Sequence, residues 1–148
     1  MKIAKALKLK NQLAGDVGQL KELLAKQNSR STKQKFDYDN REVLTRLRAK
    51  LDELVKVKAA VAAANAEIYE TIFRLAELKG LVTTLTGLDT KAGVFHEGRG
   101  FGDAAYEVEY VAQLGKVDVD KLVAELNAEI QSLQDALDEF NFTRSVNL

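Results

Sequence analysis

Residues 44–82 read LTRLRAKLDELVKVKAAVAAANAEIYETIFRLAELKGLV, and their spacing decides the fold. Positions related by alternating steps of three and four residues run through this stretch without a slip, as the core positions of a coiled coil do. We call this set the long seam, and it consists of Leu44, Leu47, Leu51, Leu54, Lys58, Val61, Asn65, Ile68, Ile72, Leu75, Lys79 and Val82. The pattern predicts either one helix of about 45 residues or two helices with a break around residues 65–69. We favour the break.

Three members of the long seam are polar, namely Lys58, Asn65 and Lys79. A lysine can lay its stem along a core and lift its charge into water. The shorter Asn65 cannot do this, so it needs a hydrogen-bond partner. It is therefore a candidate residue either for fixing the register of the helices or for forming the break, and we favour the break.

Two further stretches carry the same spacing, one near each end of the chain. The first includes Ile3, Ala6, Lys10, Leu13, Val17, Leu20 and Leu24, and the second includes Val123, Leu126, Ile130, Leu133, Leu137 and Phe140. Between the long seam and the last of these stretches, glycine recurs along the chain. There, residues 106–110 (YEVEY) alternate as a β-strand does, with residues 94–96 as a short partner strand.

The chain is therefore predicted to be mainly all-α, as an antiparallel coiled-coil-like helical bundle with a small β-hairpin between the last two helices. We expect a single domain over residues 1–148, with helices at about 2–27, 40–65, 69–87 and 119–141. Residues 28–38 are expected to form a loop, and residues 89–117 the glycine-rich β-hairpin region.

Composition agrees with this architecture and excludes some chemistry. Proline and cysteine are absent, so nothing interrupts long helices, and disulfides, thiolate catalysis and cysteine-bound metals are excluded. The start of the chain lacks the continuous apolar run of a signal peptide, and no stretch approaches the roughly 20 apolar residues of a membrane span. We therefore expect a cytoplasmic protein.

Charge is unevenly distributed although the net charge is zero. Residues 1–60 hold 15 Lys and Arg against 7 Asp and Glu, whereas residues 61–148 hold 7 against 15. Such a division occurs when a basic half binds nucleic acid, or when basic helices pack against acidic ones within a chain or between subunits. We favour the packing interpretation.

Three segments resemble the septicolysin-like family of bacterial proteins. They are MKIAKALKLKNQLAGDVGQLKELL at residues 1–24, LDELVKVKAAVAAANAEI at 51–68 and VDVDKLVAELNAEIQSLQDALDEFNFT at 117–143. The distinctive parts are the MKIAKAL start, Asn65, the VDVDKL element and the pair Phe142-Thr143. The resemblance implies a helical protein and gives no catalytic residue to carry over. The family's name suggests a haemolysin, an activity that we do not extend to a chain without a secretion signal. Members usually have a short glycine-containing loop after the position of Asn65, and this sequence has none.

Candidate catalytic features are sparse. His96 is the single histidine, and a base or metal site would need Glu97, Glu107 or Glu109 to converge on it. The glycines of residues 98–102 (GRGFG) do not lead from a strand into a helix, as a phosphate-binding loop does, so we expect a hairpin tip there. We assign no catalytic, cofactor-binding or metal-binding residue.

The strongest binding candidate is the basic region of residues 26–50, where Lys33, Lys35, Arg46 and Arg48 are candidate contacts to nucleic acid. Phe36 and Tyr38 are aromatic residues there that could stack on bases. The expected function is nevertheless a structural or interaction module that works as a homo-oligomer. An RNA- or DNA-binding helical hairpin is the alternative, and an enzyme or toxin-like activity a lower one.

Overall fold

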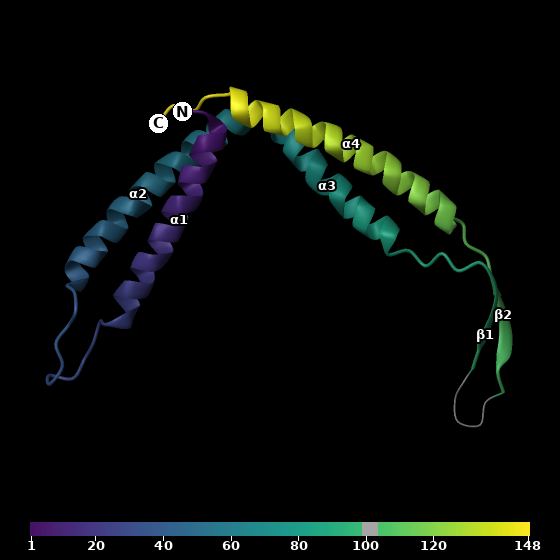
Figure 1. Cartoon of the computed structure of the whole chain (residues 1–148), viewed down its shortest axis with the longest axis horizontal. Helices are drawn as coiled ribbons and strands as arrows, with labels where there is room; N and C mark the ends of the chain where they lie inside the picture. Colours follow the sequence, from purple (N-terminus) through teal and green to yellow (C-terminus); the bar gives the residue numbers. More distant parts are fainter. Residues whose placement is uncertain (99–103) are drawn as a thin grey trace. The chain divides into compact units, whose positions relative to one another are not determined.

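The structure is a computed structural model that describes residues 1–98 and 104–148 (Figure 1). The described residues form four α-helices and one two-stranded antiparallel sheet, which lies between the third and fourth helices in the chain. This confirms the predicted fold class. The helices are α1 (Ile3–Lys26), α2 (Asn40–Ala64), α3 (Tyr69–Thr86) and α4 (Lys116–Thr143), and the strands are β1 (Gly93–Glu97) and β2 (Tyr106–Tyr110).

Contacts divide the chain into two compact units. Unit 1 consists of Met1–Tyr69 and Leu137–Leu148, and unit 2 of Glu70–Ala136. The expected single domain stays a prediction.

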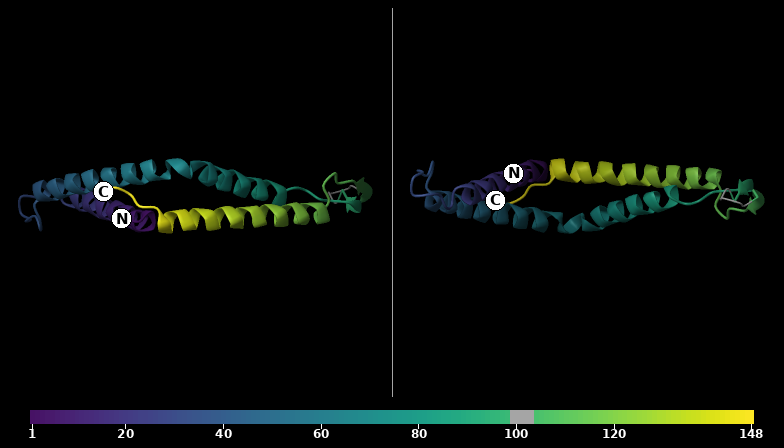
Figure 2. Two further views of the ribbon diagram at one scale, coloured as in Figure 1. Left: turned by 90° about the horizontal axis from the view of Figure 1, so that it is seen from above. Right: turned by 90° about the horizontal axis from the view of Figure 1, so that it is seen from below.

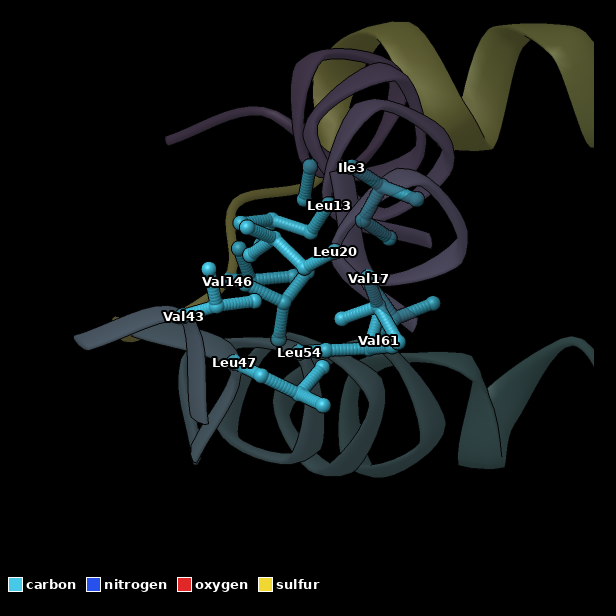
Figure 3. Close-up of a cluster of buried hydrophobic side chains, with 11 residues drawn as sticks. Ile3, Leu13, Val17, Leu20, Val43, Leu47, Leu54, Val61 and Val146 are labelled. Carbon is cyan, nitrogen blue, oxygen red and sulfur yellow. The ribbon is translucent and has the colours of Figure 1, made fainter. Parts of the chain in front are cut away.

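Unit 1 is built on the pair α1 and α2, which lie side by side in all views (Figures 1 and 2). Their facing side chains form an apolar core in which Ile3 is fully buried (Figure 3). The other buried members of this core are Ala6, Leu13, Val17, Leu20, Val43, Leu47, Leu54, Val57, Val61 and Val146. The expected apolar face of the first helix is thus the face that packs.

The core face of α2 differs from the predicted one at two positions. Val43 and Val57 are buried, whereas Leu44 is 45% exposed and Lys58 is exposed. Adjacent residues are about 100° apart around a helix. A rotation of α2 about its own axis can therefore replace one residue by its neighbour in the face that packs against α1. With this rotation the helix buries Val57 and leaves the Lys58 ammonium in water, which avoids a large desolvation cost. The prediction that Lys58 occupies a core position is therefore wrong.

The break in the long seam lies at Asn65. Helix α2 ends at Ala64, and Asn65–Glu67 form a single 3₁₀ turn before α3. The N–H of Ile68 donates to the Asn65 carbonyl at 2.9 Å. The side-chain Oδ1 of Asn65 is buried and has no hydrogen-bond partner within the described residues. The backbone therefore makes this turn without a side-chain cap from Asn65.

The two end segments of the described chain pair with each other inside unit 1. Lys2 forms an antiparallel bridge with Ser145, and the N–H of Ile3 donates to the Arg144 carbonyl at 3.0 Å. The N–H of Val146 donates to the Met1 carbonyl at 2.7 Å. These bonds seat the buried Val146 side chain in the core of α1 and α2.

Unit 2 contains most of α3, the β1–β2 hairpin and the first part of α4. The Arg74 guanidinium of α3 donates to Glu129 of α4 at 2.7 Å. Within the described part of this unit, the buried apolar side chains are Leu75, Leu78 and Val119. Leu78 is buried and Lys79 is exposed, so the core position expected for Lys79 is also wrong, for the reason that applies to Lys58.

Helix α4 begins at Lys116, earlier than expected. The Gly115 carbonyl accepts the N–H of Val119 at 3.0 Å, which is the first bond of the helix. Asp118 lies inside the first turn, and its carboxylate accepts the Gly115 N–H at 3.1 Å. A carboxylate in this turn also interacts favourably with the helix dipole.

Candidate functional site

The loop between α1 and α2 holds two of the expected nucleic-acid contacts, Lys33 and Lys35, and both side chains are exposed. The loop is organised by its own polar contacts. The Arg30 guanidinium donates to the Lys35 carbonyl at 2.8 Å and pairs with the Asp37 carboxylate at 3.6 Å. One cation of the basic region is therefore neutralised within the loop.

The other two expected contacts, Arg46 and Arg48, lie on α2. They are two residues apart, which places them about 200° apart around the helix axis. Arg46 lines a small hollow with Asp16 and Lys50, and Lys50 pairs with Asp16 at 3.9 Å. The fold therefore does not gather Arg46 and Arg48 onto one face.

A larger hollow lies where the loop meets the ends of α1 and α2. Its volume is about 1150 Å³, and it is open to solvent. We call it the loop pocket. Its walls include Lys21, Leu24, Phe36, Tyr38, Asn40 and Arg41.

Gln27 forms the polar base of this pocket and is only 6% exposed. Its side-chain amide donates to the Asp37 carboxylate at 2.6 Å, and its carbonyl oxygen accepts the Asp37 N–H at 2.9 Å. The Tyr38 hydroxyl donates to the Leu23 carbonyl at 2.6 Å. These bonds fix the loop against α1 and preform the pocket.

Asn40 is the first residue of α2 and also lines the pocket. Its amide nitrogen donates to the Leu24 carbonyl at 2.9 Å and to the Asn28 side-chain oxygen at 3.2 Å. Its own Oδ1 is buried and lacks a hydrogen-bond partner within the described residues. An unpaired buried acceptor of this kind costs about 1–3 kcal/mol.

Sequence reasoning missed Gln27 and Asn40, although one signal was present. Gln27 follows Leu20 and Leu24 by the same steps of four and three residues, so it is a polar residue at a core-type position. Asn40 carries no such signal. Asparagine is common at the start of a helix in any case, so its presence there does not indicate a pocket.

His96 lies on the exposed side of the hairpin, directly across from Glu107. Among the residues that the structure describes, no group of three or more His, Cys, Asp and Glu side chains could hold a metal ion. The expected hairpin tip at residues 98–102 lies outside the described residues, except for Gly98. Of the carboxylates considered with His96, the register thus places Glu107 opposite it, whereas Glu97 accepts a hydrogen bond from Tyr110.

The opposite face of the hairpin carries an aromatic pair. The rings of Phe95 and Tyr110 meet edge to face at 5.6 Å, with the Lys91 ammonium 5.1 Å from the centre of the Tyr110 ring. The Tyr110 hydroxyl donates to the Glu97 carboxylate. This hydrogen bond is the main reason that the pKa of Tyr110 is raised above 10.0, with desolvation and the Glu97 charge adding to it.

Within residues 1–98 and 104–148, no helix has the length and apolarity needed to cross a membrane. Comparisons with models of protein families, with curated proteins and with solved structures find no match.

Proposed function

We propose that the protein is a structural or interaction module that works as a homo-oligomer, in which a second copy covers the apolar surface of α3 and α4. The observation that carries this proposal is the partial exposure of seven apolar side chains on the core-facing sides of α3 and α4 in unit 2. These positions are Ile72, Val82, Leu85, Val123, Leu126, Ile130 and Leu133.

Further apolar side chains flank these positions. Leu81 of α3 is 44% exposed and Leu122 of α4 is 36% exposed. Complete burial of a leucine contributes roughly 1.5–3 kcal/mol relative to leaving it exposed. Association costs about 4–15 kcal/mol in lost freedom of motion, so several such side chains must be covered together. Two adjacent helices with incompletely buried seams supply that number.

Charge supports a second copy of the same chain as the partner. The net charge is zero, so two copies do not repel each other at long range. The excess of basic residues before residue 61 and of acidic residues after it also allows opposite charges to meet between copies. The septicolysin-like resemblance agrees with an interaction role, because it brings no catalytic residue. The proposal includes the cytoplasmic location expected from the sequence, which fractionation of the native cell would test.

Light scattering coupled to gel filtration tests the proposal. We expect a dimer or larger species at micromolar concentration, compared with 16.4 kDa for one chain. Replacing both Leu81 and Leu122 with glutamine should shift the protein toward monomer. The matched control replaces the exposed neighbours Thr84 and Lys121 with glutamine and should leave the mass unchanged. A wild-type protein that stays monomeric throughout this range would contradict the proposal.

Binding to generic RNA separates this proposal from the nucleic-acid alternative. We expect weak binding at about 150 mM salt, because screening reduces the contribution of scattered lysines and arginines. Submicromolar binding that is lost when Lys33, Lys35, Arg46 and Arg48 are changed to glutamine would instead favour the alternative.

A further inference from the structure

The loop pocket has the walls of a small-molecule site. Leu24 from α1, Phe36 from the loop and Leu44 from α2 give it apolar surface from three segments. Phe36 is 55% exposed, so its ring is available to a ligand. Small-molecule pockets are typically about 300–1,000 Å³, mostly apolar, with a few convergent polar groups. At about 1150 Å³, the loop pocket is slightly larger than that range.

The polar contacts beneath these walls are already made without a ligand. Gln27 is held by two hydrogen bonds to Asp37, and Tyr38 by one to the Leu23 carbonyl. A pocket whose loop is fixed in advance loses less conformational entropy on binding. The loop pocket is therefore suited to hold a ligand, because its wall does not have to be ordered when the ligand binds.

The charges around the pocket favour an anion. Lys21 and Arg41 both line it. Within the described residues, no salt bridge pairs either side chain with a carboxylate. The one carboxylate in the lining, Asp39, accepts the backbone N–H of Arg41 at 2.8 Å and caps α2. The two cations thus remain available to a negatively charged group.

From these three features we propose that the loop pocket binds a small planar organic anion. Its ring packs on Phe36, and its anionic group binds Arg41 and Lys21. Nucleoside monophosphates and aromatic carboxylates share this chemistry. The site lies wholly in unit 1 and does not depend on self-association through α3 and α4.

A fluorescence titration tests the site, because the chain has no tryptophan and Phe36→Trp places a single reporter in the pocket wall. The probes are adenosine monophosphate and 4-hydroxybenzoate, with adenosine and inorganic phosphate as partial ligands. We expect a saturable change with at least one complete probe, and a much weaker response to adenosine or phosphate. The probe that binds identifies which of the two ligand sources the pocket accepts.

Charge variants in the Phe36→Trp background complete the test. Arg41→Gln should weaken binding by about tenfold or more, since a hydrogen bond to a charged group is lost. Lys26→Gln removes a nearby cation that does not line the pocket, and it should leave binding unchanged. If Arg41→Gln loses helix content by circular dichroism, Lys21→Gln takes its place. Absence of saturable binding by both probes, or equal weakening by Lys26→Gln, would overturn the proposal.

Because tryptophan is larger than phenylalanine, a titration by calorimetry on the unaltered protein accompanies the fluorescence series. Heat of binding with the same probe is expected there too. No heat for either probe at several temperatures, together with no fluorescence change, counts against the site.

Discussion

Asn65 contributes to the turn after α2 through its backbone, since its N–H bonds to the Val61 carbonyl and its own carbonyl accepts from Ile68. Its φ of −78° and ψ of −5° are open to any residue, and only its hydrogen-bonded N–H excludes proline there. Because the side-chain Oδ1 is buried and unpaired in the described structure, Asn65→Leu removes an unsatisfied acceptor.

We therefore expect Asn65→Leu to leave the free energy of unfolding unchanged or to raise it by up to about 1 kcal/mol. From the sequence alone, a cap lost at a break would cost about 1 kcal/mol instead. Urea denaturation of the wild type and the variant measures the difference. A loss greater than 1 kcal/mol would mean that the side chain supports the turn after all.

Tyr110 provides a pH-dependent feature of the hairpin. Its hydroxyl donates to Glu97, which raises the pKa of Tyr110 above 10.0. A raised pKa means that folding favours the neutral phenol, so this contribution is complete below pH 10 and is lost as pH rises through the folded-state pKa. The hairpin should therefore loosen at strongly alkaline pH.

Carbon-13 NMR of the tyrosine ring tests this expectation. Tyr110 should titrate above 10.0 in the wild type and closer to 10.0 in Glu97→Gln. Glu107→Gln is the matched control, because Glu107 lies on the other face, opposite His96. An unperturbed or lowered pKa for Tyr110 in the wild type is the contrary result.

At the scale of the element, apolar periodicity alone does not determine which of two neighbouring residues on a helix is buried. Leu47, Leu54 and Val61 lie in the predicted seam and are buried. The intervening positions could be taken by either of two adjacent residues, and packing against α1 selects Val57 over Lys58. That selection depends on how α2 is rotated relative to α1, and the sequence of one helix does not determine this rotation.

Alanine substitutions at this pair test the observed rotation. Val57 is 4% exposed, so Val57→Ala should cost roughly 1–3 kcal/mol from lost burial and the cavity left behind. Lys58→Ala should change the free energy of unfolding by less than about 0.5 kcal/mol, as exposed substitutions do. Chemical denaturation of the two variants should therefore separate them clearly, and equal costs would argue against the observed rotation of α2.

At the scale of the whole molecule, the sequence was sufficient for features that depend on neighbouring residues along the chain. The helical stretches follow from apolar spacing, and the hairpin follows from glycines around the alternating residues 106–110. The loop pocket could not be predicted in this way. It depends on a loop whose course is set by the bonds of Asp37 to Gln27 and of Tyr38 to Leu23, and on Gln27 and Asn40, which both line the pocket.

Burial also differs between the two units, and this difference should appear in amide hydrogen exchange. Among the described residues, the core of α1 and α2 includes eleven buried side chains, whereas the described part of unit 2 has Leu75, Leu78 and Val119. Segments with few buried apolar contacts open at lower free energy. In dilute solution, α1 and α2 should therefore exchange slowly, and α3 and residues 116–136 of α4 should exchange faster.

Raising the protein concentration gives this measurement a second use. If a second copy covers α3 and α4, their amides should become more protected as concentration rises, while those of α1 and α2 change little, because mass action stabilises whatever the partner binds. The Leu81→Gln and Leu122→Gln double variant should lose this concentration dependence and keep the slow exchange of α1 and α2. Fast exchange in α3 and α4 at every concentration would show that their apolar seams stay uncovered, which would exclude self-association through this surface.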